Sequence, residues 1–165
     1  RYQTWCPGNN VNCKTFYIEE ETNNNNTNLF LNKEIHKRVS RVFNNLENYI
    51  NKKYIIDAKG NSGYQFRKIF GPTRTHKDGI YDWSKKAVGF DVTRIASVVI
   101  CLNDDYEGGE FCFPIQDITV KLKKGQILVF PPYWTHPHYT MDLKNRTYRY
   151  TINSWLHEDF KKYNI

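Results

Sequence analysis

Apolar residues recur at helical spacing in one segment of the chain and nowhere else as regularly. The segment carries an apolar residue every three or four positions, at Ile35, Val39, Val42, Leu46 and Tyr49. Residues at this spacing share one face of an α-helix, so the pattern predicts a helix over residues 33–54 that packs against a sheet. Asn32 is its expected N-cap. His36 falls on the polar flank and is expected at the surface.

From residue 64 onward the pattern is typical of β-structure. Short runs rich in β-branched and aromatic residues alternate with Gly, Pro and Asn clusters. The predicted strands are 64–70, 75–78, 94–102, 110–113, 117–122, 126–130, 136–139 and 147–155, and an entry strand is expected at 15–18. The nearly continuous apolar run 94–102 predicts a central strand buried on both faces. Residues 107–110 are expected to form a turn. One helix followed by many short strands predicts a mainly β, α+β chain of sandwich or jelly-roll type.

Length and charge limit the class of protein to which the chain can belong. The chain has 165 residues and no linker-like break, which predicts a single domain over 1–165, with helical support at about 32–54 and a β core at about 64–156. The net charge of +7 fits a Lys-rich solvated surface better than an acidic partner. No run approaches the ~20 apolar residues of a membrane-spanning helix. No signal peptide is visible, so a soluble, cytoplasmic protein is favoured; the sequence does not indicate an oligomeric state.

The four cysteines do not form a C-x-x-C pair, so they do not indicate a zinc site. Cys101 and Cys112 lie in apolar runs and are expected to be buried free thiols. Alternatively they face each other across two strands. Cys6 and Cys13 are a second candidate pair, which does not by itself establish an oxidising compartment.

A histidine and an aspartate stand two positions apart in the predicted strand 75–78. Side chains at i and i+2 of an extended strand point the same way, so His76 and Asp78 would present an imidazole and a carboxylate to one point. These are two of the three ligands of a 2-His-1-carboxylate iron site. The alternative is a surface turn before Gly79. His136 and His138, which follow the predicted strand 126–130, are the candidates for the third ligand.

Four short motifs follow one another along the chain: His76-x-Asp78, Gly108-Gly109-Glu110-Phe111, Phe130-Pro131-(x4)-His136, and Arg149-Tyr150-Thr151 with Trp155. In this order and spacing they resemble the motifs of the Fe(II)/2-oxoglutarate dioxygenases, and most closely those of the prolyl-4-hydroxylase-like branch. The resemblance covers roughly residues 64–156. It implies a double-stranded β-helix (jelly roll, cupin-like), Fe(II), the cosubstrates 2-oxoglutarate and O2, and ascorbate as a candidate reductant.

The resemblance also assigns the metal ligands. They are His76, Asp78 and His136, because Phe130-Pro131 gives His136 the lead-in found in the family. His138 then orients a ligand or contacts substrate.

The distal carboxylate of 2-oxoglutarate is assigned to Arg149, whose planar guanidinium can bind a carboxylate through two hydrogen bonds. Thr151 shares its strand face and is expected to bind the same carboxylate. Tyr64 is a candidate third contact, with simple core packing as its alternative. Arg146 is the alternative arginine, in a turn-like segment.

The implied reaction is hydroxylation of an unactivated C–H bond with release of succinate and CO2. A prolyl residue of a peptide or protein is the favoured substrate. Residues 79–90 form a candidate lid whose Tyr81 and Trp83 contact substrate, and Trp134 is a further candidate. The alternatives are the same chemistry on a free amino acid, another side chain or a nucleobase, or a non-catalytic jelly-roll binding module. Nucleic-acid dealkylating relatives usually carry a second arginine six residues after the first; this chain has Trp155 there, so nucleic acid is disfavoured.

Overall fold

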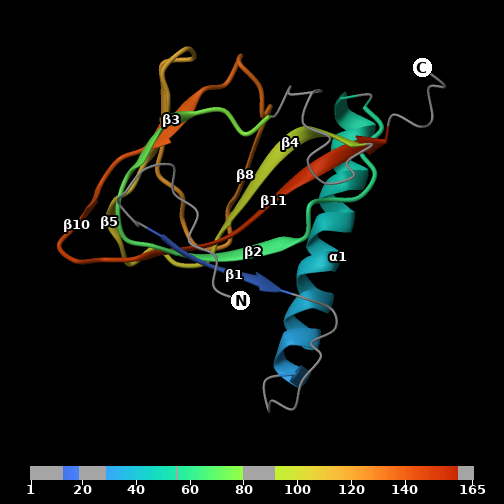
Figure 1. Ribbon diagram of the computed structural model, residues 1–165, viewed down its shortest axis with the longest axis horizontal. Coiled ribbons are helices and arrows are strands. Elements are labelled where there is room, and N and C mark those ends of the chain that lie inside the picture. The colour runs from blue at the N-terminus through green and yellow to red at the C-terminus, as the bar shows by residue number, and fades with distance from the viewer. Residues whose placement is uncertain (1–12, 19–28, 55, 80–91, 160–165) are drawn as a thin grey trace.

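The computed structural model describes residues 13–18, 29–54, 56–79 and 92–159, which form one helix and eleven strands (Figure 1). The elements are β1 (Cys13–Ile18), α1 (Leu29–Tyr54), β2 (Tyr64–Ile69), β3 (Thr73–His76), β4 (Val92–Cys101), β5 (Glu107–Gly108), β6 (Phe111–Phe113), β7 (Ile118–Val120), β8 (Ile127–Phe130), β9 (His138–Thr140), β10 (Leu143–Lys144) and β11 (Arg149–Asp159).

The strands form two main antiparallel sheets. The larger sheet has the order β1-β2-β11-β4-β8, and the smaller has the order β3-β9-β6-β7. A short ladder joins β5 to β10. The mainly β architecture with an N-terminal helix confirms the predicted fold class. β4 lies between β11 and β8, which confirms the central strand expected from its apolar sequence.

Helix α1 covers one face of the larger sheet (Figure 1). Its buried residues are Val39, Phe43 and Ile50, which pack against Val98 and Leu156 of the sheet. Helical spacing thus continues through Phe43 and Ile50. The predicted stripe was wrong at Val42 and Tyr49, which are 38% and 56% exposed.

The ends of the helix also differ from expectation. It begins at Leu29, so Asn32 lies inside it and is not the N-cap. At the other end, the Asn51 amide donates to Ala58 O at 2.9 Å and accepts from Ala58 N at 2.8 Å, which fixes the chain as it leaves the helix. His36 is half-buried rather than on the open surface, because its ring packs 5.3 Å from that of Tyr64.

A second core lies between the two sheets. It is built from Val99, Cys101, Tyr106, Phe111, Phe113, Leu122 and Phe130. Strand residues directly opposite each other share a face, and the register pairs Thr151 with Cys101 and Ser97 with Phe130. Odd-numbered residues of β11 therefore face this interior, and even-numbered ones face α1.

The remaining differences are local. The strand predicted at 75–78 is Thr73–His76, and that predicted at 136–139 begins only at His138. Glu107 and Gly108, expected in a turn, form β5 and pair with β10, a strand that no sequence pattern predicted. Cys101 and Cys112 are buried and free, as expected; the Cys6–Cys13 pair lies outside the described side chains. In the part of the chain that the structure describes, no helix is long and apolar enough to cross a membrane.

Candidate active site

Three metal-ligating side chains meet at the end of the smaller sheet. His76 and His138 stand opposite each other on β3 and β9, and Asp78 follows two residues after His76. Asp78 Oδ1 lies 3.4 Å from His76 Nε2 and 3.9 Å from His138 Nε2. One ligand atom from each residue lies within 4.8 Å of the others. The group is half-buried to buried, and its two imidazoles and one carboxylate are the donor set of a facial iron triad.

The third member of the group is His138, so the expectation of His136 is corrected. His136 precedes β9, in a turn where its backbone N–H donates to Tyr133 O at 2.9 Å. Its ring contacts the Thr135 hydroxyl at 3.0 Å. The two histidines are two residues apart, but the extended strand starts only at His138. The argument that residues i and i+2 share a face therefore does not reach His136.

Backbone carbonyls orient both imidazoles. His76 Nδ1 lies 2.7 Å from Arg74 O, and His138 Nδ1 lies 3.1 Å from His136 O. A carbonyl only accepts, so each Nδ1 carries a proton, and each Nε2 faces Asp78 Oδ1. This arrangement, in which the outer nitrogen donates to the protein, is typical of metal-bound histidines. His136 thus contributes its carbonyl rather than its ring.

Asp78 stays ionised despite its burial. Burial alone raises the pKa of its carboxyl group, but the hydrogen bond from His76, the charge of His138 and the hydrogen bond from Ser97 hold the pKa well below its usual range. Burial lowers the pKa of His138 more than the Asp78 charge raises it, which favours the neutral, ligating form.

Two residues that contact Asp78, Ser97 and Arg94, belong to none of the sequence motifs. Ser97 Oγ on β4 donates to Asp78 Oδ2 at 2.7 Å, which leaves Oδ1 facing the two imidazoles. Arg94 Nη1 donates to Asp78 O at 2.8 Å. The guanidinium of Arg94 lies 3.9 Å above the ring of Trp155. Only the alternation of β4, which places Ser97 on the interior face, hints at its role.

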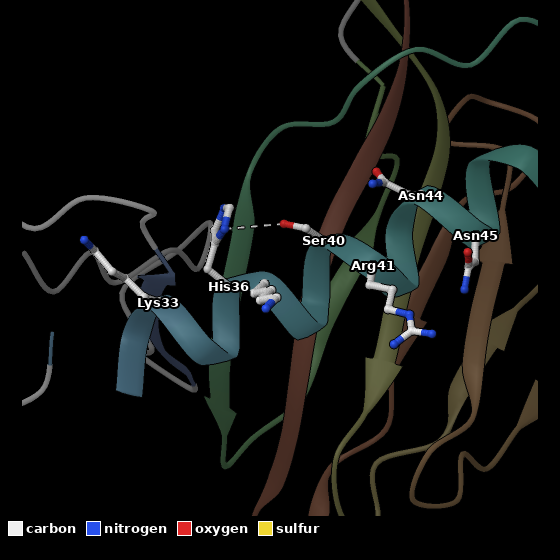
Figure 2. A pocket seen from close by; sticks show the side chains of 7 residues that line it. Lys33, His36, Ser40, Arg41, Asn44 and Asn45 are labelled. Atoms are coloured by element: carbon white, nitrogen blue, oxygen red, sulfur yellow. Dashed lines mark hydrogen bonds between the residues drawn. The ribbon is translucent and has the colours of Figure 1, made fainter. Parts of the chain in front are cut away.

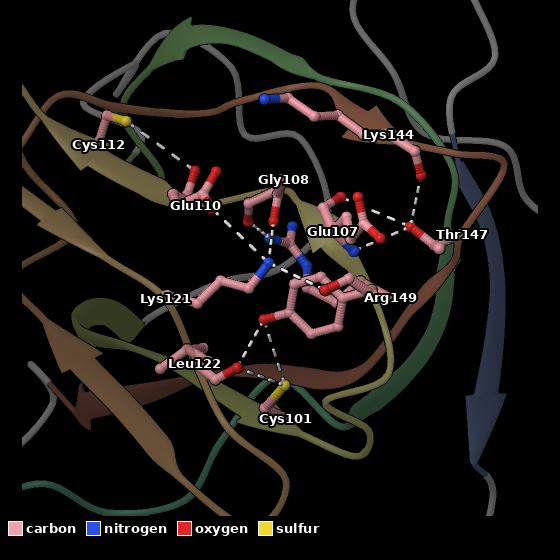
Figure 3. A network of polar contacts seen from close by, with 12 residues as sticks. Cys101, Glu107, Gly108, Glu110, Cys112, Lys121, Leu122, Lys144, Thr147 and Arg149 are labelled. Carbon is pink, nitrogen blue, oxygen red and sulfur yellow. Dashed lines mark hydrogen bonds and ion pairs between the residues drawn. The ribbon is translucent and has the colours of Figure 1, made fainter.

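Arg149 lies in the interior core, as its aromatic strand predicted. It is 1% exposed, and its Nη1 donates to Gly109 O (Figure 3). Its guanidinium carbon lies 4.6 Å from the centre of the Phe111 ring. Thr151 is also fully buried on the same face, but its hydroxyl donates to Asn153 Oδ1 at 2.6 Å. Arg146 is exposed, in a turn where its φ is +56°.

Tyr64 does not belong to this site, and that expectation is corrected. Its ring lies 4.9 Å from that of Phe43, on the helix-facing side of the larger sheet. Strand β2 alternates like its neighbours, so Arg67, opposite the interior residue Thr151, faces inward instead. The guanidinium carbon of Arg67 lies 5.9 Å from the centre of the Trp155 ring.

Comparison with known proteins identifies this arrangement. The family model described as the 2OG-Fe(II) oxygenase superfamily matches residues 64–157, more than half of the chain. The chain belongs to the 2OG-Fe(II) oxygenase superfamily. A search of curated proteins finds no significant match. Family membership implies Fe(II), 2-oxoglutarate and O2, and makes the protein an oxidoreductase of the dioxygenase type.

Several solved structures share the fold of this oxygenase. A Trichoplax adhaerens prolyl hydroxylase in complex with a hypoxia-inducible-factor peptide is 17% identical, with a TM-score of 0.69 over 98% of this chain and 72% of that one. A Pseudomonas putida prolyl-4-hydroxylase is 17% identical, with a TM-score of 0.62 over 88% and 72% of the two chains. The viral collagen prolyl hydroxylase of Paramecium bursaria Chlorella virus-1, as its 2-oxoglutarate complex, is 20% identical, with a TM-score of 0.60 over 74% and 72%. These likenesses confirm the double-stranded β-helix fold.

One pocket lined by described residues lies apart from the oxygenase site. It is a hollow of about 630 Å³ against α1, with Lys33, Lys37 and Arg41 on its wall and His36 Nδ1 3.4 Å from Ser40 Oγ (Figure 2). Its lining includes no member of the His76, Asp78 and His138 group. We regard it as the solvated basic side of the helix.

The predicted substrate contacts are only partly described. Tyr81 and Trp83, and with them the candidate lid 79–90 beyond Gly79, lie outside the described residues. Gly79 itself is buried, and its N–H donates to Pro132 O at 2.6 Å. Trp134 is 69% exposed on the β8–β9 connection that leads to His138, so its ring is accessible to a partner.

Proposed function

We propose that this protein hydroxylates a prolyl residue of a peptide or protein, using Fe(II), 2-oxoglutarate and O2. The observation that carries the proposal is the convergence of His76 Nε2, His138 Nε2 and Asp78 Oδ1 within 4.8 Å of one another. A buried carboxylate is costly unless it is paired or holds a cation.

The residues present fit the implied cofactors. His76, His138 and Asp78 would hold Fe(II), and Arg149 would bind the distal carboxylate of 2-oxoglutarate from inside the same barrel. When bound, iron and 2-oxoglutarate supply the oxidising chemistry: 2-oxoglutarate yields succinate and CO2, and one oxygen atom enters the substrate C–H bond.

The chain's own residues position and shield this chemistry. Ser97 and the Arg74 and His136 carbonyls fix the ligand atoms before any metal arrives, so little reorganisation accompanies binding. The His138 ring is 4% exposed, with the rings of Phe130 and Phe113 4.6 and 5.7 Å away. These rings exclude water from one side of the site.

The prolyl substrate is supported by the neighbouring structures, one of which is a prolyl hydroxylase in complex with a peptide. Trp134, exposed on the β8–β9 connection, offers an aromatic surface of the kind on which a proline ring packs. Ascorbate dependence, a cytoplasmic location and organisation as one domain remain predictions.

The substrate test uses Fe(II)-loaded protein with 2-oxoglutarate, O2 and a proline-rich peptide. We expect succinate release together with a peptide mass gain of one oxygen atom, located on proline by fragmentation. Free L-proline and the same peptide with alanine in place of proline are the controls. Succinate release that no proline-containing peptide stimulates, combined with oxidation of free L-proline, would show that the substrate class is wrong.

The cosubstrate site has its own test in Arg149→Ala. We expect the Kd and KM for 2-oxoglutarate to rise at least about tenfold, because a buried charge-assisted pair contributes roughly 1.5–3 kcal/mol. Arg146→Ala removes an equal charge three residues away at an exposed turn and should change neither value. Metal binding should survive in both variants. The opposite pattern would transfer the role to Arg146.

A further inference from the structure

Gly108, the last residue of β5, and Gly109 lie directly against Arg149, and we call this pair the Gly108–Gly109 turn. The two residues have φ of +70° and +67°, the left-handed region that glycine adopts without steric cost. Gly109 O accepts from Arg149 Nη1. A Cβ on Gly109 would overlap Leu143 Cδ2 at 2.8 Å and would lie 3.4 Å from that Nη1. A side chain at position 109 would therefore displace Leu143 and would touch the guanidinium.

The turn is held from two sides. Gly109 N–H donates to Asp142 O at 3.0 Å, which joins the turn to the connection between β9 and β10. From β7's end, Lys121 Nζ donates to Gly108 O and, at 3.1 Å, to Tyr106 O, and lies 3.6 Å from Glu110 Oε1. These contacts fix the position of the Gly109 carbonyl.

Two of the contacts of Arg149 help to orient the plane of its guanidinium. The Gly109 carbonyl binds its edge, and the Phe111 ring lies 4.6 Å from its central carbon. A guanidinium binds a carboxylate through two parallel N–H bonds only when its plane points at the carboxylate. The orientation of the plane is therefore a determinant of affinity for an anion.

We propose that the Gly108–Gly109 turn is a positioning element that aims Arg149 at the cosubstrate and so sets the affinity for 2-oxoglutarate. The proposal rests on the function proposed for Arg149. It gives residues 107–110 a role in binding the cosubstrate, in addition to their role in connecting β5 to β6.

Gly109→Ala compared with Gly125→Ala tests the proposal. Gly125 has φ of +83°, so both variants strain the backbone, but a Cβ at Gly125 meets nothing within 4 Å. The first readout is the Kd of 2-oxoglutarate for Mn(II)-loaded protein, measured by calorimetry. We expect a rise of about tenfold in Gly109→Ala, the effect of misaligning a charge-assisted hydrogen bond, and less than about twofold in Gly125→Ala.

The second readout separates positioning from damage. In 2-oxoglutarate turnover without other substrate, Gly109→Ala should raise KM while kcat at saturation and metal affinity stay near the parent values. A purely structural defect would instead lower kcat and metal affinity together, and that result would overturn the proposal.

Two further variants keep the outcome decisive. Lys121→Met removes the ammonium that holds Gly108 O without straining the chain, and should raise the Kd about threefold, the effect of losing one ordinary hydrogen bond. If Gly109→Ala does not fold, an unchanged Kd in Lys121→Met overturns the positioning role.

Arg149→Ala separates this proposal from the function proposed for Arg149. If Arg149→Ala leaves the Kd for 2-oxoglutarate unchanged, Arg149 is not the anchor. If Arg149→Ala weakens binding but Gly109→Ala binds as Gly125→Ala does, Arg149 is the anchor and the turn does not aim it.

Discussion

The two faces of the five-stranded sheet bury different polar side chains although they share the same strands. The side that faces α1 buries mainly apolar residues, such as Val98 and Leu156, and one serine, Ser154. The side that faces the barrel interior also has an apolar core, but it buries Ser97, Arg149 and Thr151 as well, each no more than 1% exposed.

Successive residues of one strand face opposite sides of the sheet. One side therefore mainly stabilises the fold, and the other carries the functional residues. Burying apolar surface stabilises the fold by roughly 25 cal/mol per Å², whereas a buried polar group contributes little net stability even when it is hydrogen-bonded. The helix side therefore supplies the stability that allows the interior side to carry an arginine, a threonine and a serine. Tyr64 and Arg67, three residues apart on β2, illustrate the rule: the first packs on Phe43 and the second faces inward.

The largest expected effect is on stability, from the helix side. Phe43→Ala removes a fully buried ring and should lower the free energy of unfolding by about 3–5 kcal/mol, measured by urea denaturation. Val42→Ala, one residue away but 38% exposed, is the control and should cost less than about 1 kcal/mol. The affinity of folded Phe43→Ala protein for 2-oxoglutarate should be unchanged. If instead the two variants are equally stable, α1 does not supply the core that the comparison assigns to it.

A smaller effect, on function alone, is expected from the interior side. Ser97→Ala removes the donor that holds Asp78 Oδ2 and should weaken metal binding by about 10–100-fold, the usual cost of losing a partner of a metal ligand. Ser154→Ala is matched to it, since Ser154 is equally buried and opposite Val98 on the helix-facing side. Metal titration should show a change only in Ser97→Ala. Equal losses in both would mean that the two faces are not functionally distinct.

Much of this organisation could be predicted from the sequence, because it depends on local patterns. His76 ends β3 and Asp78 follows it by two residues, and the aromatic run around Arg149 indicated a buried arginine. The strand order along the chain and the single helix also follow from periodicity.

The errors arose where the answer depends on distant pairing. His136 and His138 have the same parity, and only the register of β9 against β3, which places His138 opposite His76, selects between them. The side of the sheet that Tyr64 faces likewise depends on where α1 packs and on the pairing of β2 with β11. Ser97 belongs to an apolar run without any motif, so its contact with Asp78 follows only from the folded distance of 2.7 Å.

The central claim is that His76, Asp78 and His138 bind iron, and paired histidine variants test it most directly. Fe(II) or Mn(II) binding is titrated in His138→Ala and His136→Ala. His136→Ala keeps the backbone carbonyl that accepts from His138 Nδ1, so it is a matched control. The account predicts one metal ion per chain in the parent and in His136→Ala, and loss of stoichiometric binding in His138→Ala. Full binding by His138→Ala, with loss in His136→Ala, would contradict the account.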